Sequence, residues 1–133
     1  MESEFEDAIF LDGQDVVALH AEAMGCSESD ALGRVRSPAS LDGAVARPLW
    51  YSTYGGDLAI QAAALAHGIA EGQPFIDGNK RTALVALRAF FFLNGWVLDA
   101  SQAERAGWIL RLADDLSVEQ FADLLRGSMA PVS

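Results

Sequence analysis

Residues 79 to 93 are the feature that most limits how this chain can fold, because they are apolar on almost every side of a helix. A helix with no polar face must be covered by other elements, so we expect it to be central and buried. Asn94-Gly95 supplies a stop signal at its end. Its most apolar part, residues 83 to 93, is interrupted by Arg88 and is too short to cross a bilayer.

Capping residues predict further helices, so the expected fold class is all-α. Asp12 precedes an apolar pattern of helical period that stops at Gly25, and Asp57 precedes an Ala-rich segment from Leu58 to about Ala70. The many alanines of that second segment predict close contact between helices. Three more helices are expected, over about 101–115, over 117–126 with a capping box of Ser117 and Gln120, and from Ser40 or Asp42 to Pro48.

The remaining segments lack a helical pattern. Residues 27 to 38 are polar and are expected to form a loop, and residues 49 to 56 are expected to be extended or to form a small hairpin closed by Gly55-Gly56. The last six residues are expected to be loose. We therefore expect one compact helical domain over residues 1–133, with a core of about 10–126.

Composition excludes several classes of protein. Nine Lys and Arg against nineteen Asp and Glu give a net charge of −10, which repels nucleic acid and anionic membranes. Cys26 is the only cysteine, so neither a disulfide framework nor a cysteine zinc site is expected. The acidic start, residues 1 to 7, is unlike a signal peptide, and the expected location is the cytoplasm.

The chemistry is concentrated between Gln73 and Arg81, where a loop enters the apolar helix. The first turn of a helix offers free backbone N–H groups and a partial positive charge, which together attract anions. Lys80 and Arg81 add two cations there, Gly78 allows close approach of the backbone, and Asp77 is an oxygen ligand suited to Mg²⁺ on phosphates. The combination predicts a site for a magnesium nucleotide. The alternative is that Asp77 only caps the helix and both cations are solvated.

The segment Gln73-Pro-Phe-Ile-Asp-Gly-Asn-Lys-Arg-Thr-Ala-Leu84 resembles the signature loop of the Fic/Doc superfamily, H-x-F-x-[DE]-[GA]-N-[GK]-R-x-x-R. It is most similar to the Doc (death-on-curing) branch, in which the second half reads N-K-R-T-A. Similarity extends over roughly residues 10 to 125, including the first helix, residues 41–48 and Gly95-Trp96. The resemblance implies a compact all-α domain with the loop between two central helices and a short extended flap.

The resemblance also implies an activity. Doc toxins of type II toxin–antitoxin systems phosphorylate a threonine of elongation factor Tu from ATP and arrest translation, and a small Phd-type antitoxin neutralises them. Fic members typically transfer AMP to a protein hydroxyl instead. Leu84 stands where Fic enzymes carry a second motif arginine, which favours the phosphoryl-transfer branch.

Site residues are implied position by position. Asp77 matches the acidic residue that holds Mg²⁺, Gly78 and Asn79 match the turn that cradles phosphates, and Lys80 and Arg81 match the pair that contacts the phosphates of ATP. Phe75 matches the residue that anchors the loop.

An aromatic segment is implied to act on the target. Trp50, Tyr51 and Tyr54 fall where a flap positions the target peptide by β-pairing.

Gln73 departs from the family pattern, which has the general-base histidine at this position. A carboxamide does not take up a proton near neutral pH, and general-base catalysis is worth about 10²- to 10⁴-fold in rate. Three explanations stay open: a natural variant with lost or altered activity, a substitution introduced to disarm a toxin, or a base from elsewhere, for which His67 is the obvious candidate. A structural role is expected for His20. Arg88 could extend the phosphate site or pair with a carboxylate, and the ion pair is the expected role.

The sequence is therefore compatible with two functions. The first is a Doc-like toxin enzyme that uses Mg-ATP and is impaired by Gln73. The second is a catalytically silent domain that binds nucleotide or antitoxin and acts as a regulator.

Overall fold

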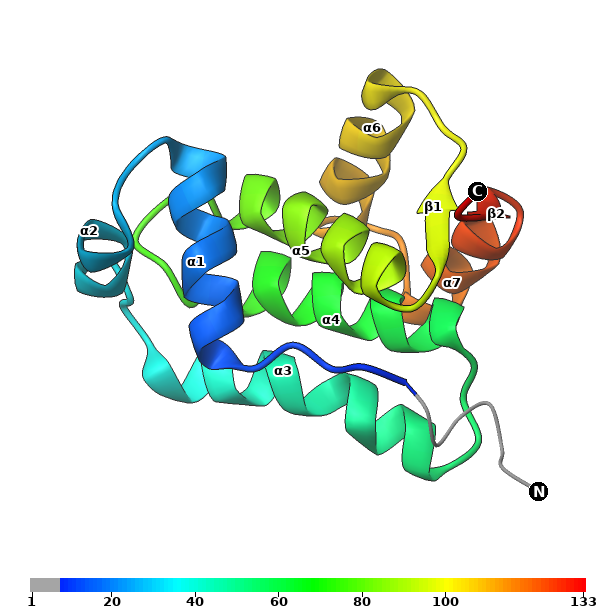
Figure 1. Ribbon diagram of the computed structural model, residues 1–133, viewed down its shortest axis with the longest axis horizontal. Coiled ribbons are helices and arrows are strands. Elements are labelled where there is room, and N and C mark those ends of the chain that lie inside the picture. The colour runs from blue at the N-terminus through cyan, green and yellow to red at the C-terminus, as the bar shows by residue number, and fades with distance from the viewer. Residues whose placement is uncertain (1–7) are drawn as a thin grey trace.

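The computed structural model describes residues 8–133, which form seven helices and one two-stranded sheet (Figure 1). The expected all-α class is therefore confirmed. The helices are α1 (Gly13–Met24), α2 (Glu28–Gly33), α3 (Pro38–Thr53), α4 (Leu58–Gly72), α5 (Asn79–Leu93), α6 (Gln102–Leu112) and α7 (Val118–Arg126), and the strands are β1 (Trp96–Leu98) and β2 (Met129–Pro131). Within the described residues, no helix is long and apolar enough to cross a membrane. The acidic residues 1–7 lie outside the described part.

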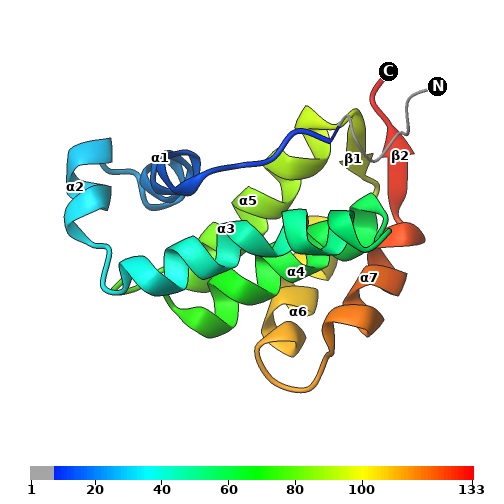
Figure 2. The ribbon, with the colours of Figure 1, turned by 90° about the horizontal axis from the view of Figure 1, so that it is seen from below.

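Helix α4 forms the centre of the molecule. It lies between α3 and α5 in Figure 1, and it contacts both of them and α7, which lies beside it in Figure 2. Eleven of its fifteen residues are buried. All the alanines of this helix are in the core, as the expected close helix contacts require, and Gly68 lies directly against Ala44 of α3.

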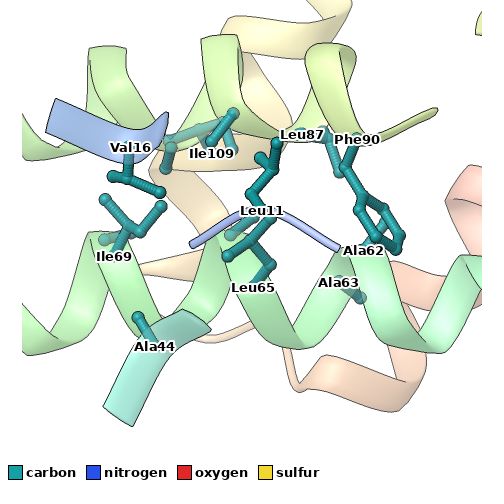
Figure 3. Close-up of a cluster of buried hydrophobic side chains, with 14 of the residues drawn as sticks. Leu11, Val16, Ala44, Ala62, Ala63, Leu65, Ile69, Leu87, Phe90 and Ile109 are labelled. Atoms are coloured by element: carbon teal, nitrogen blue, oxygen red, sulfur yellow. The ribbon is translucent and has the colours of Figure 1, made fainter. Parts of the chain in front are cut away.

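Helix α5 is buried on one face only. Thr82, Ala86 and Phe90 are among its fully buried residues, whereas Phe92 is 62% exposed. The prediction that α5 is central and buried therefore holds only for the face that meets α4. Of the two helices, α4 has more buried residues. Figure 3 shows the core between them, where Leu87 and Phe90 of α5 face Leu65 and Ala62 of α4.

Several boundaries follow from capping residues, as predicted. Asp12 accepts a hydrogen bond from the backbone of Asp15 and completes a capping box, and α1 ends at Gly25 in the left-handed conformation. Asp57 caps α4 through the backbone N–H of Ile60. Ser117 and Gln120 form the predicted capping box of α7. Helix α6 begins after its cap Ser101 and ends at Leu112, three residues before the predicted end.

The segment from 27 to 38 is not a continuous loop. Ser27 caps the short helix α2, and Ser37 caps α3 with Pro38 at its first position, where a missing N–H costs nothing. Sequence reasoning placed the start of α3 at Ser40 or Asp42 because it read Pro38 as part of the loop.

Pro48 does not end α3, and residues 49 to 53 are helical rather than extended. A proline inside a helix costs about 3 kcal/mol through its missing hydrogen bond and its steric clash. Pro48 is buried in the interface that α3 forms along α4, and this packing offsets the cost. The predicted extended segment of residues 49–56 is therefore wrong, and the helix ends only at Tyr54.

The last residues are not all loose. Met129–Pro131 pairs in antiparallel register with Trp96–Leu98, and the N–H of Val132 donates to the carbonyl of Gly95 at 2.9 Å. This small sheet ties the end of the chain to the end of α5. Three-residue strands carry no usable alternating pattern, so the sequence did not reveal them.

Candidate functional site

The loop between α4 and α5 is held in place by the segment that joins α2 to α3. The backbone N–H groups of Arg36 and Ser37 both donate to the carbonyl of Pro74, at 2.7 and 3.1 Å. In return, the N–H of Ile76 donates to the carbonyl of Arg34 at 2.9 Å. These bonds place the backbone of residues 34–37 beside the signature loop, a relationship that the sequence analysis missed.

Phe75 fixes the loop from inside. Its ring is fully buried and lies against the imidazole of His20 on α1, with ring centroids 3.8 Å apart. The side chain of Asn79 brackets the same residue, because it accepts from the N–H of Phe75 and donates to its carbonyl, both at 2.9 Å. Asn79 thus shapes the loop with its side chain, and its backbone N–H stays free in the first turn of α5.

His20 on α1 contacts both the loop and helix α5. Its Nδ1 lies 2.6 Å from the hydroxyl oxygen of Thr82 on α5, and its buried Nε2 has no partner within residues 8–133. Burial lowers the pKa of His20, Asp77 opposes this shift, and Arg34 adds to it. The imidazole is therefore neutral near pH 7, in agreement with the structural role expected for it.

A cavity of about 610 Å³ opens at the start of α5, a size typical of small-molecule sites. Its lining contains Met24, Ala70, Gln73, Ile76, Asp77, Gly78, Asn79, Lys80 and Arg81. The structure therefore brings Gln73, Asp77 and the two cations around one opening, as the sequence analysis expected. Met24 and Ala70 were not expected there, and no sequence signal pointed to them.

The start of α5 is arranged to receive an anion. Gly78 stands at the N-cap with φ 72° and ψ 17°, and no side chain caps the helix. A Cβ at this position would overlap the sulfur of Met24, so glycine lets the backbone line the cavity closely. Lys80 and Arg81 are exposed and form no ion pair with any described residue. Two unpaired cations in the first turn oppose the helix dipole unless an anion is bound there.

Asp77 fits the role of a magnesium ligand. Its carboxylate is exposed on the rim of the same cavity. No group of three metal-binding side chains occurs within residues 8–133, so a metal here would take its other ligands from water and phosphate. This is how Mg²⁺ is commonly held beside nucleotides, by one or two carboxylates and the phosphates themselves.

Gln73 adopts an unusual backbone conformation at the end of α4. Its φ of 48° and ψ of 58° place it in the left-handed region, and it is the only non-glycine residue between 8 and 133 with positive φ. Such conformations cost about 1 kcal/mol or more and are concentrated at functional sites. The guanidinium of Arg36 donates to the backbone carbonyl of Gln73 at 2.8 Å and to its side-chain oxygen at 3.3 Å.

His67 does not replace the missing base. Its Nδ1 lies 2.8 Å from a guanidinium nitrogen of Arg47 on α3, and it is absent from the cavity lining. Burial and Arg47 both lower the pKa of His67.

The ion pair expected for Arg88 is not present in the described part of the chain, where Arg88 lines a different cavity.

The aromatic residues of the expected flap lie away from the loop. Trp50 and Tyr51 are in the last turns of α3, Tyr54 ends that helix, and the ring of Trp50 contacts those of both tyrosines. This end of α3 lies beside the start of α4, whereas the loop follows the end of α4 (Figure 1). The fifteen residues of α4 separate them by about 22 Å. No strand edge occurs at Trp50, Tyr51 or Tyr54, so β-pairing of a target peptide there has no structural basis.

The fold and the loop together define a helical domain with an uncapped turn, two cations and one carboxylate at the start of a core helix. Residues 10–91 of the chain match the Fic/DOC family. The chain is also 34% identical over 120 residues to the protein named Toxin Doc of Mycolicibacterium smegmatis. The aligned residues cover 87% of this chain and 77% of that protein. The chain therefore belongs to the Fic/DOC family.

Proposed function

We propose that this protein is a Doc-type toxin of a toxin–antitoxin pair, which transfers the γ-phosphoryl group of Mg-ATP to a protein hydroxyl. The relative of 34% identity is named Toxin Doc, and this likeness supports the toxin class and an antitoxin partner, which we expect to be of the Phd type. A threonine of elongation factor Tu is the target we expect, with arrest of translation as the result. Leu84 in place of an arginine favours phosphoryl transfer over AMP transfer.

The observation that carries this proposal is the arrangement of charges around the cavity at the start of α5. Free N–H groups, Lys80 and Arg81 converge on one opening, and Asp77 lies on its rim. Neither cation forms an ion pair with a described carboxylate, and both lie in the first turn of α5, where the helix dipole disfavours a cation unless an anion is bound nearby. A magnesium triphosphate supplies the matching negative charge and the metal for Asp77.

Each residue has a stated part in binding. Lys80 and Arg81 hold phosphate oxygens and stabilise the charge that develops during transfer. Gly78 and the backbone of Asn79 approach the phosphates through N–H groups. Asp77 is the protein ligand of Mg²⁺, which when bound neutralises phosphate charge and aligns the transferred group.

Gln73 makes the proposed reaction slow. A carboxamide can orient the attacking hydroxyl by hydrogen bonding but cannot accept its proton. The loss of a general base is worth about 10²- to 10⁴-fold in rate. Phosphoryl transfer relies strongly on positioning and electrostatics, which explains how a basal rate can persist.

A second candidate is a catalytically silent domain that binds nucleotide or antitoxin and acts as a regulator. The contact of Arg36 with the side-chain oxygen of Gln73 favours it, because that oxygen is occupied within the protein rather than free for a hydroxyl. AMP transfer is the remaining alternative, and the assay below separates it.

The test is incubation of the protein with purified elongation factor Tu and ATP labelled at either the α- or the γ-phosphate. We expect weak γ-label transfer by the wild type, at least a hundredfold more by Gln73→His, and none by the Gln73→His, Asp77→Asn double variant. Transfer of α-label would show AMP transfer instead. Absence of both labels in every variant, together with measurable ATP binding, would support the silent regulator.

A further inference from the structure

Arg36 contacts Gln73 at two points. One guanidinium nitrogen, Nη2, donates to the backbone carbonyl at 2.8 Å and to the side-chain Oε1 at 3.3 Å. The backbone N–H of Arg36 is also bonded to the next residue of the loop, Pro74, at 2.7 Å. Arg36 forms no ion pair with a described carboxylate, so Gln73 is its principal partner among residues 8–133.

This contact determines which end of the carboxamide remains free. A guanidinium has only donors, so it can bond the oxygen of the amide and not the nitrogen. Nε2 of Gln73 has two N–H donors and no partner within the described chain, and Gln73 lines the cavity together with Lys80 and Arg81. The group offered to a ligand is consequently a hydrogen-bond donor.

We propose that Arg36 is a positioning residue that turns Gln73 into a phosphate-binding donor, with Nε2 bonded to an oxygen of the bound nucleotide. This inference rests on the proposed function, because it assumes that the cavity binds a nucleotide. Gln73 then strengthens the binding of the nucleotide in the ground state. A general base at the same position would instead assist proton transfer. The left-handed backbone of Gln73, held through the same Nη2 contact, presents the side chain at the cavity.

The first test measures the affinity for Mg-ATP by calorimetry in four proteins: wild type, Gln73→Met, Arg36→Met and the double variant. Met matches Gln in length and has no donor. We expect Gln73→Met to weaken binding about tenfold and Arg36→Met to weaken it severalfold. In the Gln73→Met background, Arg36→Met should have little further effect, because its action passes through the carboxamide.

Equal affinity of Gln73→Met and wild type would overturn the inference. An effect of Arg36→Met that is the same in both backgrounds would overturn it too, since it would show a direct charge effect or a general structural one. The control is Arg111→Met, which removes an exposed cation on α6 outside the cavity lining and is expected to leave the affinity unchanged.

The second test follows the side-chain amide signals of Gln73 by NMR, which Gln73→Met identifies by their loss. We expect these signals to shift when Mg-ATP is added to the wild type and to shift in the free protein when Arg36 is replaced. Unchanged signals on ATP binding would contradict the inference while leaving the proposed function intact. If the wild type binds no Mg-ATP at all, the proposed function and this inference both fail.

Discussion

The imidazole of His20 lies flat against the ring of Phe75, with centroids 3.8 Å apart and planes 3° apart. The same imidazole contacts the hydroxyl of Thr82 at 2.6 Å. One side chain of α1 therefore joins the loop to the first turns of α5. The position of the cavity depends on this link, because Phe75 and Thr82 stand on either side of Gly78.

The buried state of His20 makes the stability depend on pH. Burial lowers its pKa in the folded protein below the ordinary value near 6.5, so the unfolded chain binds more protons as the pH falls through that value. The free energy of unfolding should therefore be highest above pH 6.5 and decrease between pH 6.5 and 5. Urea denaturation at a series of pH values measures this.

The matched variants are His20→Asn and His67→Asn, because the pKa of His67 is lowered too. Each substitution should remove part of the pH dependence, and the double variant should be nearly flat in this range. A slope that is unchanged in His20→Asn would mean that its protonation does not oppose folding.

Gly78 can be tested against Gly25, which has a similar φ. Gly25 has φ 67° and open space around it, whereas Gly78 has φ 72° and faces Met24. An alanine at either position should cost about 1–2 kcal/mol for the left-handed backbone. Only Gly78→Ala should also displace Met24, whose sulfur contacts Arg81 at 3.9 Å, and so weaken Mg-ATP binding. Equal nucleotide affinity in both variants would contradict the close approach proposed for Gly78.

Gly68 tests the contact between α3 and α4. A Cβ there would lie 2.9 Å from both Cα and Cβ of Ala44, and backbone atoms cannot move aside easily. We expect Gly68→Ala to destabilise the protein by about 1–3 kcal/mol, as overpacking does. Gly107→Ala in α6, where no atom is near, should instead stabilise it by about 0.5–1 kcal/mol. Thermal denaturation of both variants decides this, and a stable Gly68→Ala protein would rule out the tight contact.

Local signals predicted the helices that begin at a capping side chain. Asp12, Asp57 and Ser117 cap helices as expected, because an N-cap needs only a side-chain oxygen and the next few N–H groups. The end of α3 could not be predicted from Pro48, because packing against α4 decides whether this helix tolerates an internal proline. The pairing of 96–98 with 129–131 depends on contacts far apart in the chain and has no local signal.

The site was predicted in part. Asp77, Gly78, Lys80 and Arg81 could be placed together because they are close in sequence, in a loop and the first turn of one helix. Arg36 lies 37 positions before Gln73, and only the fold shows that they meet. Trp50 and Tyr54 were assigned to the site from a resemblance of position along the chain, and the length of α4 separates them from it.

Restoring a base at position 73 should reveal the influence of Arg36. Gln73→His should raise transfer by about 10²- to 10⁴-fold. The nearby guanidinium disfavours protonation of the introduced imidazole, so its pKa should lie below the ordinary value. Adding Arg36→Met should raise that pKa and move the acidic limb of the pH–rate profile to higher pH. An identical profile with and without Arg36 would show that it does not face the introduced ring.

Calorimetric titration of the wild-type protein with Mg-ATP tests the central claim most directly. The account predicts saturable binding at one site, lost in the Lys80→Ala, Arg81→Ala double variant and retained in Arg111→Met. It also predicts that Asp77→Asn weakens binding in the presence of Mg²⁺ more than in its absence. Absence of wild-type binding at millimolar Mg-ATP, or full binding by the double variant, would contradict the claim that the start of α5 holds a nucleotide.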